Sequence, residues 1–202
     1  MPRHERVRQA GNSRLRIASA AARLMADGGI GDFGLAKKKA LRQLGLPENT
    51  PLPDNAEVET ELRAYQALYH GDEQLVHLRA LRETALEVME LLEDFKPYLT
   101  GSVLDGTAGR FSDINILLFA DSAKDVEIFL LNHGAAFEHL EASDERIDAV
   151  LQLQTEVADV KLVILAPNFE RVTFRSHDGR VREKAKIAAV RQLLDASGAI
   201  EA

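Results

Sequence analysis

Two oxygen-bearing side chains, Asp113 and Asn115, stand two residues apart at the start of an apolar segment. Residues with this spacing on a strand point to the same face, so both side chains would lie together. Carboxylate and amide oxygens are ligands that Mg²⁺ accepts. A later segment, "ADVKLVIL", brings Asp159, which joins them if its strand lies beside that of Asp113. The pattern predicts a cation site on one face of a sheet.

A Gly101–Ser102 pair stands ahead of these oxygen ligands, with ten residues between Ser102 and Asp113. The backbone can approach a ligand closely at a glycine, which has no side chain. Backbone N–H groups and the serine hydroxyl can then receive phosphate oxygens. A phosphate-binding turn beside a cation site is the arrangement that metal-dependent phosphoryl transfer requires.

These residues resemble a known family. The "GS" pair, the ten-residue interval, "SDIN" and the later "DVKLVIL" look like the nucleotidyltransferase superfamily, with its DNA polymerase beta-like fold, and above all like its small bacterial members. The resemblance covers residues 97–166. It implies a mixed sheet flanked by helices, and transfer of a nucleoside monophosphate from an NTP, ATP by preference, to an acceptor hydroxyl.

The resemblance also implies roles for single residues. Gly101 and Ser102 would bind the triphosphate, and Asp159 would orient or deprotonate the acceptor hydroxyl. Asp113, Asn115 and Asp159 would hold Mg²⁺ or Mn²⁺. The remaining nucleotide-binding residues expected from the motif are Arg110, Ser112 and Lys161.

Two of these positions have alternative readings. Arg110 would contact a phosphate as a planar fork, or cap its own loop. Lys161 would neutralise the triphosphate, or pair with an acid on the neighbouring strand.

Asn115 departs from the family pattern, which has a second carboxylate at this position. An amide oxygen can bind Mg²⁺ but brings no negative charge, and the lost charge is worth several kcal/mol even at an effective dielectric of about 20. Two hypotheses follow. The chain is a nucleotidyltransferase weakened by Asn115, or a degenerate relative that binds nucleotide or nucleic acid without catalysis.

The hydrophobic periodicity predicts an α+β protein with a helical N-terminal region, residues 1–70, followed by a nucleotidyltransferase-like domain, residues 71–202. Ser13 is expected to cap the first helix, which Gly28–Gly29 ends, and Gly45 to end the second. The expected helices span 14–29, 33–45, 56–71, 73–95, 122–134 and 182–198, and the expected strands span 98–104, 114–119, 137–142, 147–155 and 157–166.

Composition limits the other functions. The 202-residue chain has no cysteine, so thiolate chemistry, disulfides and Cys-based metal sites are excluded. The six histidines form no i, i+4 pair, and no Gly-x-Ser-x-Gly or Walker motif is present. No apolar stretch is long enough to span a membrane, and we expect a cytoplasmic protein without a membrane partner.

Charge is distributed unevenly. Residues 1–46 hold ten Lys or Arg and three acids, so this segment carries +7 and the remainder −14 of the net −7. Such a basic segment would contact nucleic acid, for example as a helix-turn-helix over residues 29–46. Alternatively it packs against the acidic body or against a second protomer of a homo-oligomer, or it remains solvated.

Overall fold

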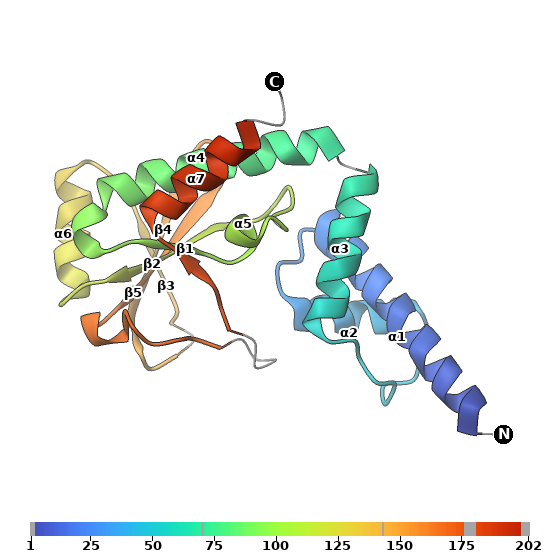
Figure 1. The fold of residues 1–202 in the computed structure, drawn as a ribbon. Helices are drawn as coiled ribbons and strands as arrows, with labels where there is room; N and C mark the ends of the chain where they lie inside the picture. Colours follow the sequence, from blue (N-terminus) through green and yellow to red (C-terminus); the bar gives the residue numbers. More distant parts are fainter. Residues whose placement is uncertain (1–2, 70, 143, 176–180, 199–202) are drawn as a thin grey trace. The chain divides into compact units, whose positions relative to one another are not determined.

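The computed structural model describes residues 3–69, 71–142, 144–175 and 181–198. The chain divides into two compact units: unit 1 comprises Met1–Leu75 and Gly109–Phe111, and unit 2 comprises Val76–Ala108 and Ser112–Ala202. Unit 1 is helical, and unit 2 is a sheet flanked by helices (Figure 1). The expected α+β class is therefore confirmed. The expected domain boundary after residue 70 stays a prediction.

Unit 1 is built from α1 (Arg3–Ala26), α2 (Phe33–Gln43) and α3 (Asn55–Tyr69). Small residues dominate its interior and let the helices approach closely. The main cluster consists of Ile17, Ala18, Ala21, Ala36, Ala40, Leu41 and Val58, each 6% exposed or less.

The first helix is longer than the periodicity predicted. Ser13 was expected as its N-cap, but α1 begins at Arg3, so Ser13 lies inside the helix and this prediction is wrong. The segment before Ser13 contains no proline after Pro2 and one glycine, which a helix tolerates at a cost of about 1 kcal/mol. The expected end is confirmed, since α1 stops at Ala26 and Gly29 has a φ of 64°.

Caps fix the ends of the next two helices. Asp32 accepts a hydrogen bond from the backbone N–H of Leu35 at 2.6 Å, and Gly45 follows α2 with a φ of 63°. Asp54 and Glu57 form a reciprocal capping box at the start of α3: each side chain accepts from the other residue's backbone N–H, at 2.8 and 2.7 Å.

Replacing Asp54 with alanine is expected to destabilise unit 1 by about 1 kcal/mol, because the backbone N–H of Glu57 loses its acceptor. Urea unfolding followed by the helical circular dichroism signal would measure the change. Glu48→Ala, an exposed acid in the preceding loop, is the matched control. Equal midpoints for the two variants would show that the capping box contributes nothing to stability.

Unit 2 contains, in the described residues, a six-stranded mixed sheet in the order β3-β4-β5-β2-β1-β6. Only the central β2–β5 pair is parallel; the other neighbours are antiparallel. The strands are β1 (Tyr98–Thr100), β2 (Ile114–Phe119), β3 (Glu138–Leu140), β4 (Ile147–Gln154), β5 (Asp159–Leu165) and β6 (Lys184–Ala185).

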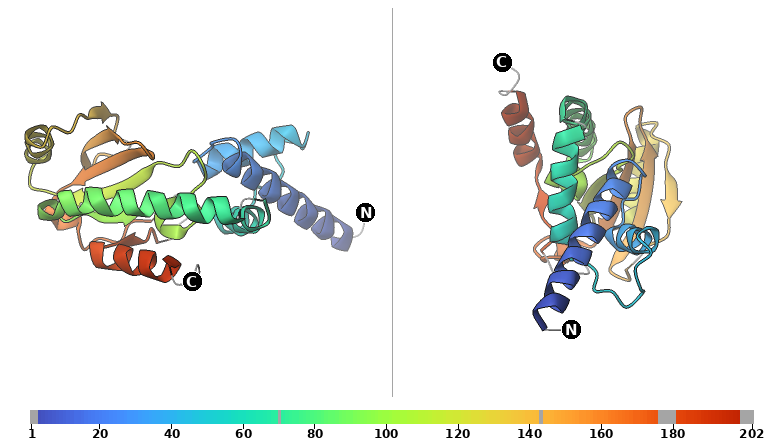
Figure 2. Two further views of the ribbon diagram at one scale, coloured as in Figure 1. Left: turned by 90° about the horizontal axis from the view of Figure 1, so that it is seen from above. Right: turned by 90° about the vertical axis from the view of Figure 1, so that its right-hand side faces the viewer.

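One face of the sheet carries the core. Alternate residues of β2 and β5, such as Ile114, Ile116 and Leu162, pack against helices on this side. These helices are α4 (Gly71–Leu91), α6 (Ala123–Asn132) and α7 (Ile187–Gly198). In Figures 1 and 2, α4 crosses the sheet and α7 runs beside α4. Arg191 of α7 binds Glu90 of α4 at 2.7 Å.

Two predicted elements of unit 2 are corrected. The strand expected over 98–104 ends at Thr100, because Gly101 has φ 78° and ψ −157°, and Ser102 starts the short helix α5 (Ser102–Asp105). The helix expected over 182–198 begins only at Ile187; the preceding Lys184–Ala185 forms β6 at the sheet edge. Short 3₁₀ turns at Glu93–Phe95 (η1) and Pro167–Phe169 (η2) complete the unit. In the described part of the chain, every helix is too short or too polar to cross a bilayer.

Candidate functional site

The parallel pairing of β2 with β5 brings the two predicted acids together. Ile114 pairs with Val160, and Asp113 and Asp159 each stand one residue before this pair. Neighbouring strands lie about 4.8 Å apart, so the two carboxylates start from adjacent backbone positions. The strand of Asp159 therefore lies beside that of Asp113, as the predicted cation site requires.

A row of polar residues crosses the same face of the sheet. Reading from the β6 edge, the paired residues are Lys184, Thr100, Asn115, Lys161 and Gln152, one from each of five strands. The next row along the strands is apolar: Tyr98 pairs with Leu117, Leu117 with Val163, and Val163 with Val150. The face opposite the main core is thus divided into a polar half, which carries the candidate site, and an apolar half.

Both carboxylates have a partner across the strands. The Lys161 ammonium donates to Oδ2 of Asp113 at 2.5 Å, and the two side chains are 33% and 36% exposed. Gln152 Nε2 donates to Oδ2 of Asp159 at 2.7 Å. Of the two roles considered for Lys161, the structure contains the ion pair with an acid on the neighbouring strand. In each carboxylate the second oxygen, Oδ1, has no hydrogen-bond partner among the described residues.

Asn115, the middle residue of the polar row, also lies beside the Gly101 turn. Its Nδ2 donates to the backbone carbonyl of Asp113 at 3.3 Å. A Cβ placed on Gly101 would be 3.6 Å from this nitrogen, so the turn and the amide are neighbours. The backbone of Gly101 lies in a region almost restricted to glycine. Gly101 and Asn115 therefore lie together, and the phosphate-binding role expected for Gly101 and Ser102 stays a prediction.

Arg82 of α4 holds the far end of this turn. Its Nε and one terminal nitrogen donate to the carbonyls of Val103 and Leu104 at 3.1 and 3.2 Å. The residue is 8% exposed, and burial lowers the pKa of its guanidinium. Sequence reasoning missed Arg82, because an arginine on the inner side of an amphipathic helix carries no local signal of its acceptors.

The contacts of Thr100 and Gln152, near the site, were also missed. Thr100 donates to the carbonyl of Glu183 at 2.7 Å and ties β1 to the segment before β6. Lys184 lies 5.1 Å from the ring centroids of both Tyr98 and Phe119, and burial lowers the pKa of its ammonium. Alternation within "IDAVLQLQT" could have placed Gln152 on a polar face, but not opposite Lys161, because register depends on the neighbouring strand.

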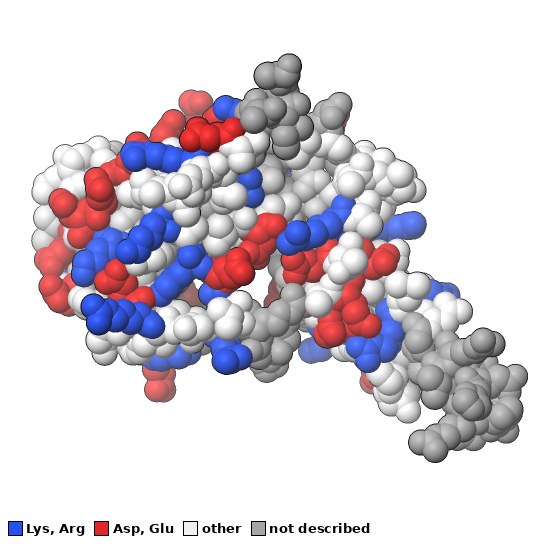
Figure 3. Space-filling view, viewed as in Figure 1, with Lys and Arg blue, Asp and Glu red and all other residues white. Residues whose placement is uncertain are grey.

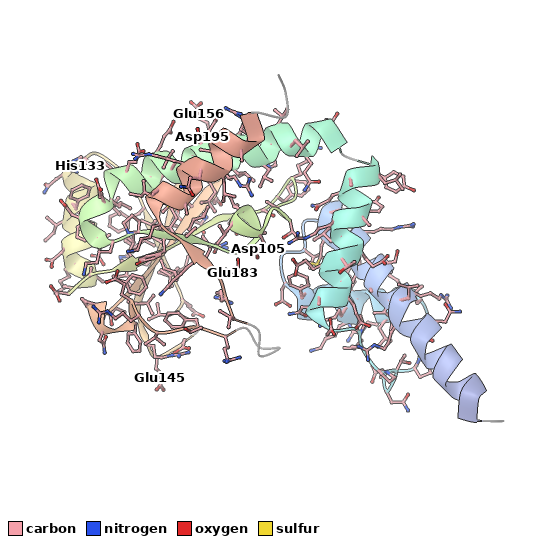
Figure 4. All side chains as sticks on the ribbon, viewed as in Figure 1. Asp105, His133, Glu145, Glu156, Glu183 and Asp195 are labelled. Carbon is pink, nitrogen blue, oxygen red and sulfur yellow. The ribbon has the colours of Figure 1, made fainter. Side chains whose placement is uncertain are left out.

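The two remaining predicted nucleotide-binding residues are Arg110 and Ser112. Arg110 is exposed, stacks over Phe111 at 5.9 Å, and is grouped with unit 1. Ser112 is half-buried, and the nucleotide-binding roles expected for both residues stay predictions. Asp105, the last residue of α5, is exposed, as is Glu145 in the turn before β4 (Figure 4).

The donor set for a divalent cation consists of few groups. Among the described residues, no three His, Cys, Asp or Glu side chains are grouped closely enough to hold a metal ion. The predicted set is two carboxylates and the Asn115 amide, all oxygen donors of the type Mg²⁺ prefers. The set fits a cation that shares its coordination with substrate phosphates, provided that the Lys161 ammonium leaves Asp113.

Comparison with known proteins gives little further guidance. No family model and no curated protein matches the chain. Among solved structures, one that matches is described as a cytoplasmic RNA terminal U-transferase, with 18% identity and a TM-score of 0.29. The match covers 55% of this chain and 29% of that chain. The chain is therefore similar to a part of that protein at a level too low to establish a common fold. The assignment of the candidate site depends on the geometry of its own residues.

Proposed function

We propose that the chain transfers a nucleoside monophosphate from an NTP, with ATP as the simplest donor, to the hydroxyl of an acceptor. The observation that carries the proposal is the register of β2 and β5, which sets Asp113 and Asp159 side by side with Asn115 and the Gly101 turn. Each group has a place in the reaction. Gly101 and Ser102 bind the triphosphate, Asp113 and Asn115 face the reacting phosphate, and Asp159 faces the acceptor.

The reaction exchanges one phosphorus–oxygen bond for another. The acceptor oxygen bonds to the α-phosphorus, the bond between that phosphorus and the α,β-bridging oxygen breaks, and pyrophosphate leaves. The hydroxyl proton passes to Asp159. Because Gln152 holds Oδ2 of Asp159 at 2.7 Å, Oδ1 is the oxygen that takes the proton.

A divalent cation fits this scheme as part of the metal–nucleotide complex. Asp113, Asn115 and Asp159 would hold it, and it would neutralise charge on the reacting and leaving phosphates. Lys161 then moves from Asp113 to the triphosphate, which offers its ammonium more negative charge than a single carboxylate. The two roles considered for Lys161 become two states of one side chain.

A second function is favoured by the ion pair itself. Lys161 already neutralises Asp113 at 2.5 Å, and Asn115 supplies no charge for a dication. A site with these features can bind the phosphates of a nucleotide through Lys161 without a cation and without transfer. The chain would then be a degenerate nucleotidyltransferase that acts as a nucleotide-binding module.

One experiment separates the two functions. The purified protein is incubated with ATP labelled at the α-phosphate, with Mn²⁺ or with EDTA, alone and with cell extract. If the chain is a transferase, we expect a labelled acceptor with Mn²⁺ and none with EDTA, and loss of the label in Asp113→Asn. Asn115→Asp should label the acceptor at least about tenfold faster, since a tenfold change in rate corresponds to only about 1.4 kcal/mol. Glu145→Gln, an exposed acid outside the site, is the control.

Binding of labelled ATP is measured in the same samples by equilibrium dialysis. ATP bound equally with Mn²⁺ and with EDTA, and transferred by neither wild type nor Asn115→Asp, would replace the transferase with the binding module. Loss of that binding in Lys161→Met would assign it to this site. Neither binding nor transfer in any variant would overturn both functions.

A further inference from the structure

A second candidate site lies in unit 1, apart from the residues given roles above. A groove of about 520 Å³ runs between one side of α1 and the C-terminal end of α2. Its α1 side is a helical stripe at i, i+3, i+4, i+7, i+8 and i+11, so these side chains share one face. The stripe consists of Arg16, Ser19, Ala20, Arg23, Leu24 and Asp27; Gly28 follows it, and Gln43 and Leu44 close the other side.

Among the described residues of the unit, the cations of this groove have no ionic partner. Arg16 and Arg23 make no ion pair with any described residue, and the same holds for Lys39 and Arg42 on the neighbouring part of α2. By contrast, Arg14 binds Glu57 at 2.5 Å. Unpaired cations therefore lie at the groove and its edge, while Arg14 and Arg63 elsewhere in the unit are each paired with an acid.

The acid in the groove does not cancel this charge. Asp27 accepts a hydrogen bond from the hydroxyl of Tyr65 at 2.7 Å, and Arg23 lies over the Tyr65 ring at 5.7 Å. Against this one carboxylate stand Arg16 and Arg23 in the lining and Lys39 one turn before Gln43. On the face of unit 2 seen in Figure 3, acidic and basic side chains are interspersed.

We propose that this groove binds single-stranded nucleic acid through its phosphodiester backbone. Guanidinium groups suit phosphate because their planar fork can donate two hydrogen bonds to it. Arg16 and Arg23 are seven residues apart, about 10 Å along the helix, so they reach different phosphates of one strand. Ser19 and Gln43 add neutral donors between them, and the aliphatic floor of Ala20, Leu24 and Leu44 packs against sugars and bases.

We expect the groove to favour a single strand over a duplex. A flexible strand can enter a groove between two helices, whereas a duplex meets only the groove's rim. Direct backbone contact carries no sequence information, so the binding is expected to be sequence-tolerant and salt-dependent. The sequence predicted a helix-turn-helix that would contact duplex DNA. This proposal replaces it with a groove that binds one strand.

The test uses fluorescein-labelled oligo(U), oligo(dT) and a mixed-sequence duplex, each of about 20 nucleotides per strand, titrated with the full chain at several salt concentrations. We expect both single strands to bind more tightly than the duplex. In the Arg16→Gln/Arg23→Gln double variant, the slope of log K against log salt should fall by about 1.4, since each lost contact removes about 0.7. Arg63→Gln, whose arginine is already paired with Glu59 at 2.7 Å, is the matched control and should bind as wild type.

Further arms separate this groove from the site in unit 2. Asp113→Asn and Lys161→Met should bind oligo(U) as tightly as wild type, and Arg23→Lys should retain most of the salt dependence because it keeps the charge. Unchanged binding in the double variant, tighter binding of the duplex, or equal competition by polyglutamate would each overturn the proposal. Failure of ATP labelling with normal oligo(U) binding would overturn only the transferase.

Discussion

The Lys161→Met variant is expected to bind Mn²⁺ at least about tenfold more tightly than wild type in the absence of nucleotide, a change of about 1.4 kcal/mol or more. The ammonium of Lys161 occupies Oδ2 of Asp113 at 2.5 Å, where a cation bound to the same carboxylate would meet it. At about 5 Å and an effective dielectric of about 20, a dication and an ammonium repel by roughly 7 kcal/mol. Most of this repulsion is relieved when the flexible lysine swings away, so the expected gain is a fraction of it.

Mn²⁺ binding can be followed by the loss of the free-ion signal in electron paramagnetic resonance, which does not depend on any activity. Lys124→Met, an exposed lysine on α6, is the control for the change in net charge. ATP should reduce the difference between Lys161→Met and wild type, because in the wild-type complex Lys161 has already moved to the phosphates. Equal Mn²⁺ affinity for Lys161→Met and Lys124→Met would show that Lys161 does not compete for the carboxylate.

The contacts of Lys161 also show where sequence reasoning about the site stops. Alternation places Asp159 and Lys161 on one face of their strand, and it does the same for Asp113 and Asn115. It does not determine which strands are neighbours, and the hydrogen bonds of the site cross from strand to strand. The pairing of Lys161 with Asp113 could be named as an alternative from residue types alone. The acceptor of Gln152 could not, because the register of β4 against β5 depends on tertiary pairing and not on either strand alone.

The errors in the fold have local causes. Residues 98–104 are strand-like in composition, but Gly101 takes a positive φ that turns the chain after three strand residues. Lys184 and Ala185 have helix-forming side chains, yet they form β6 because Leu99 and Thr100 offer an edge to pair with. Tertiary pairing overrides propensity in such short segments. Longer elements with a strong period, such as α3 and β2, were predicted within one or two residues of their ends.

Replacing Arg82 with methionine is expected to destabilise unit 2 by about 3 kcal/mol. The buried guanidinium donates to the carbonyls of Val103 and Leu104, which lie at the end of a helix too short to satisfy them itself. Methionine fills much of the same volume without a donor, so both carbonyls lose their partner, at about 1–3 kcal/mol each. Part of the cost is recovered because no charge is then buried.

The same substitution three residues earlier supplies the control. Arg79 lies on the same helix, is 39% exposed and is paired with Glu83 at 2.9 Å, so Arg79→Met should change stability by about 0.5 kcal/mol or less. Urea unfolding gives the global difference, and hydrogen exchange of the amides in residues 101–108 gives the local one. If Arg82 positions the phosphate-binding turn, ATP binding should weaken in Arg82→Met under conditions where the protein remains folded. Arg82→Lys, which reaches one carbonyl, should recover part of the lost ATP affinity. Stability and ATP affinity equal to those of Arg79→Met would mean that the turn between Gly101 and Gly106 keeps its shape without Arg82, and that its glycines alone determine it.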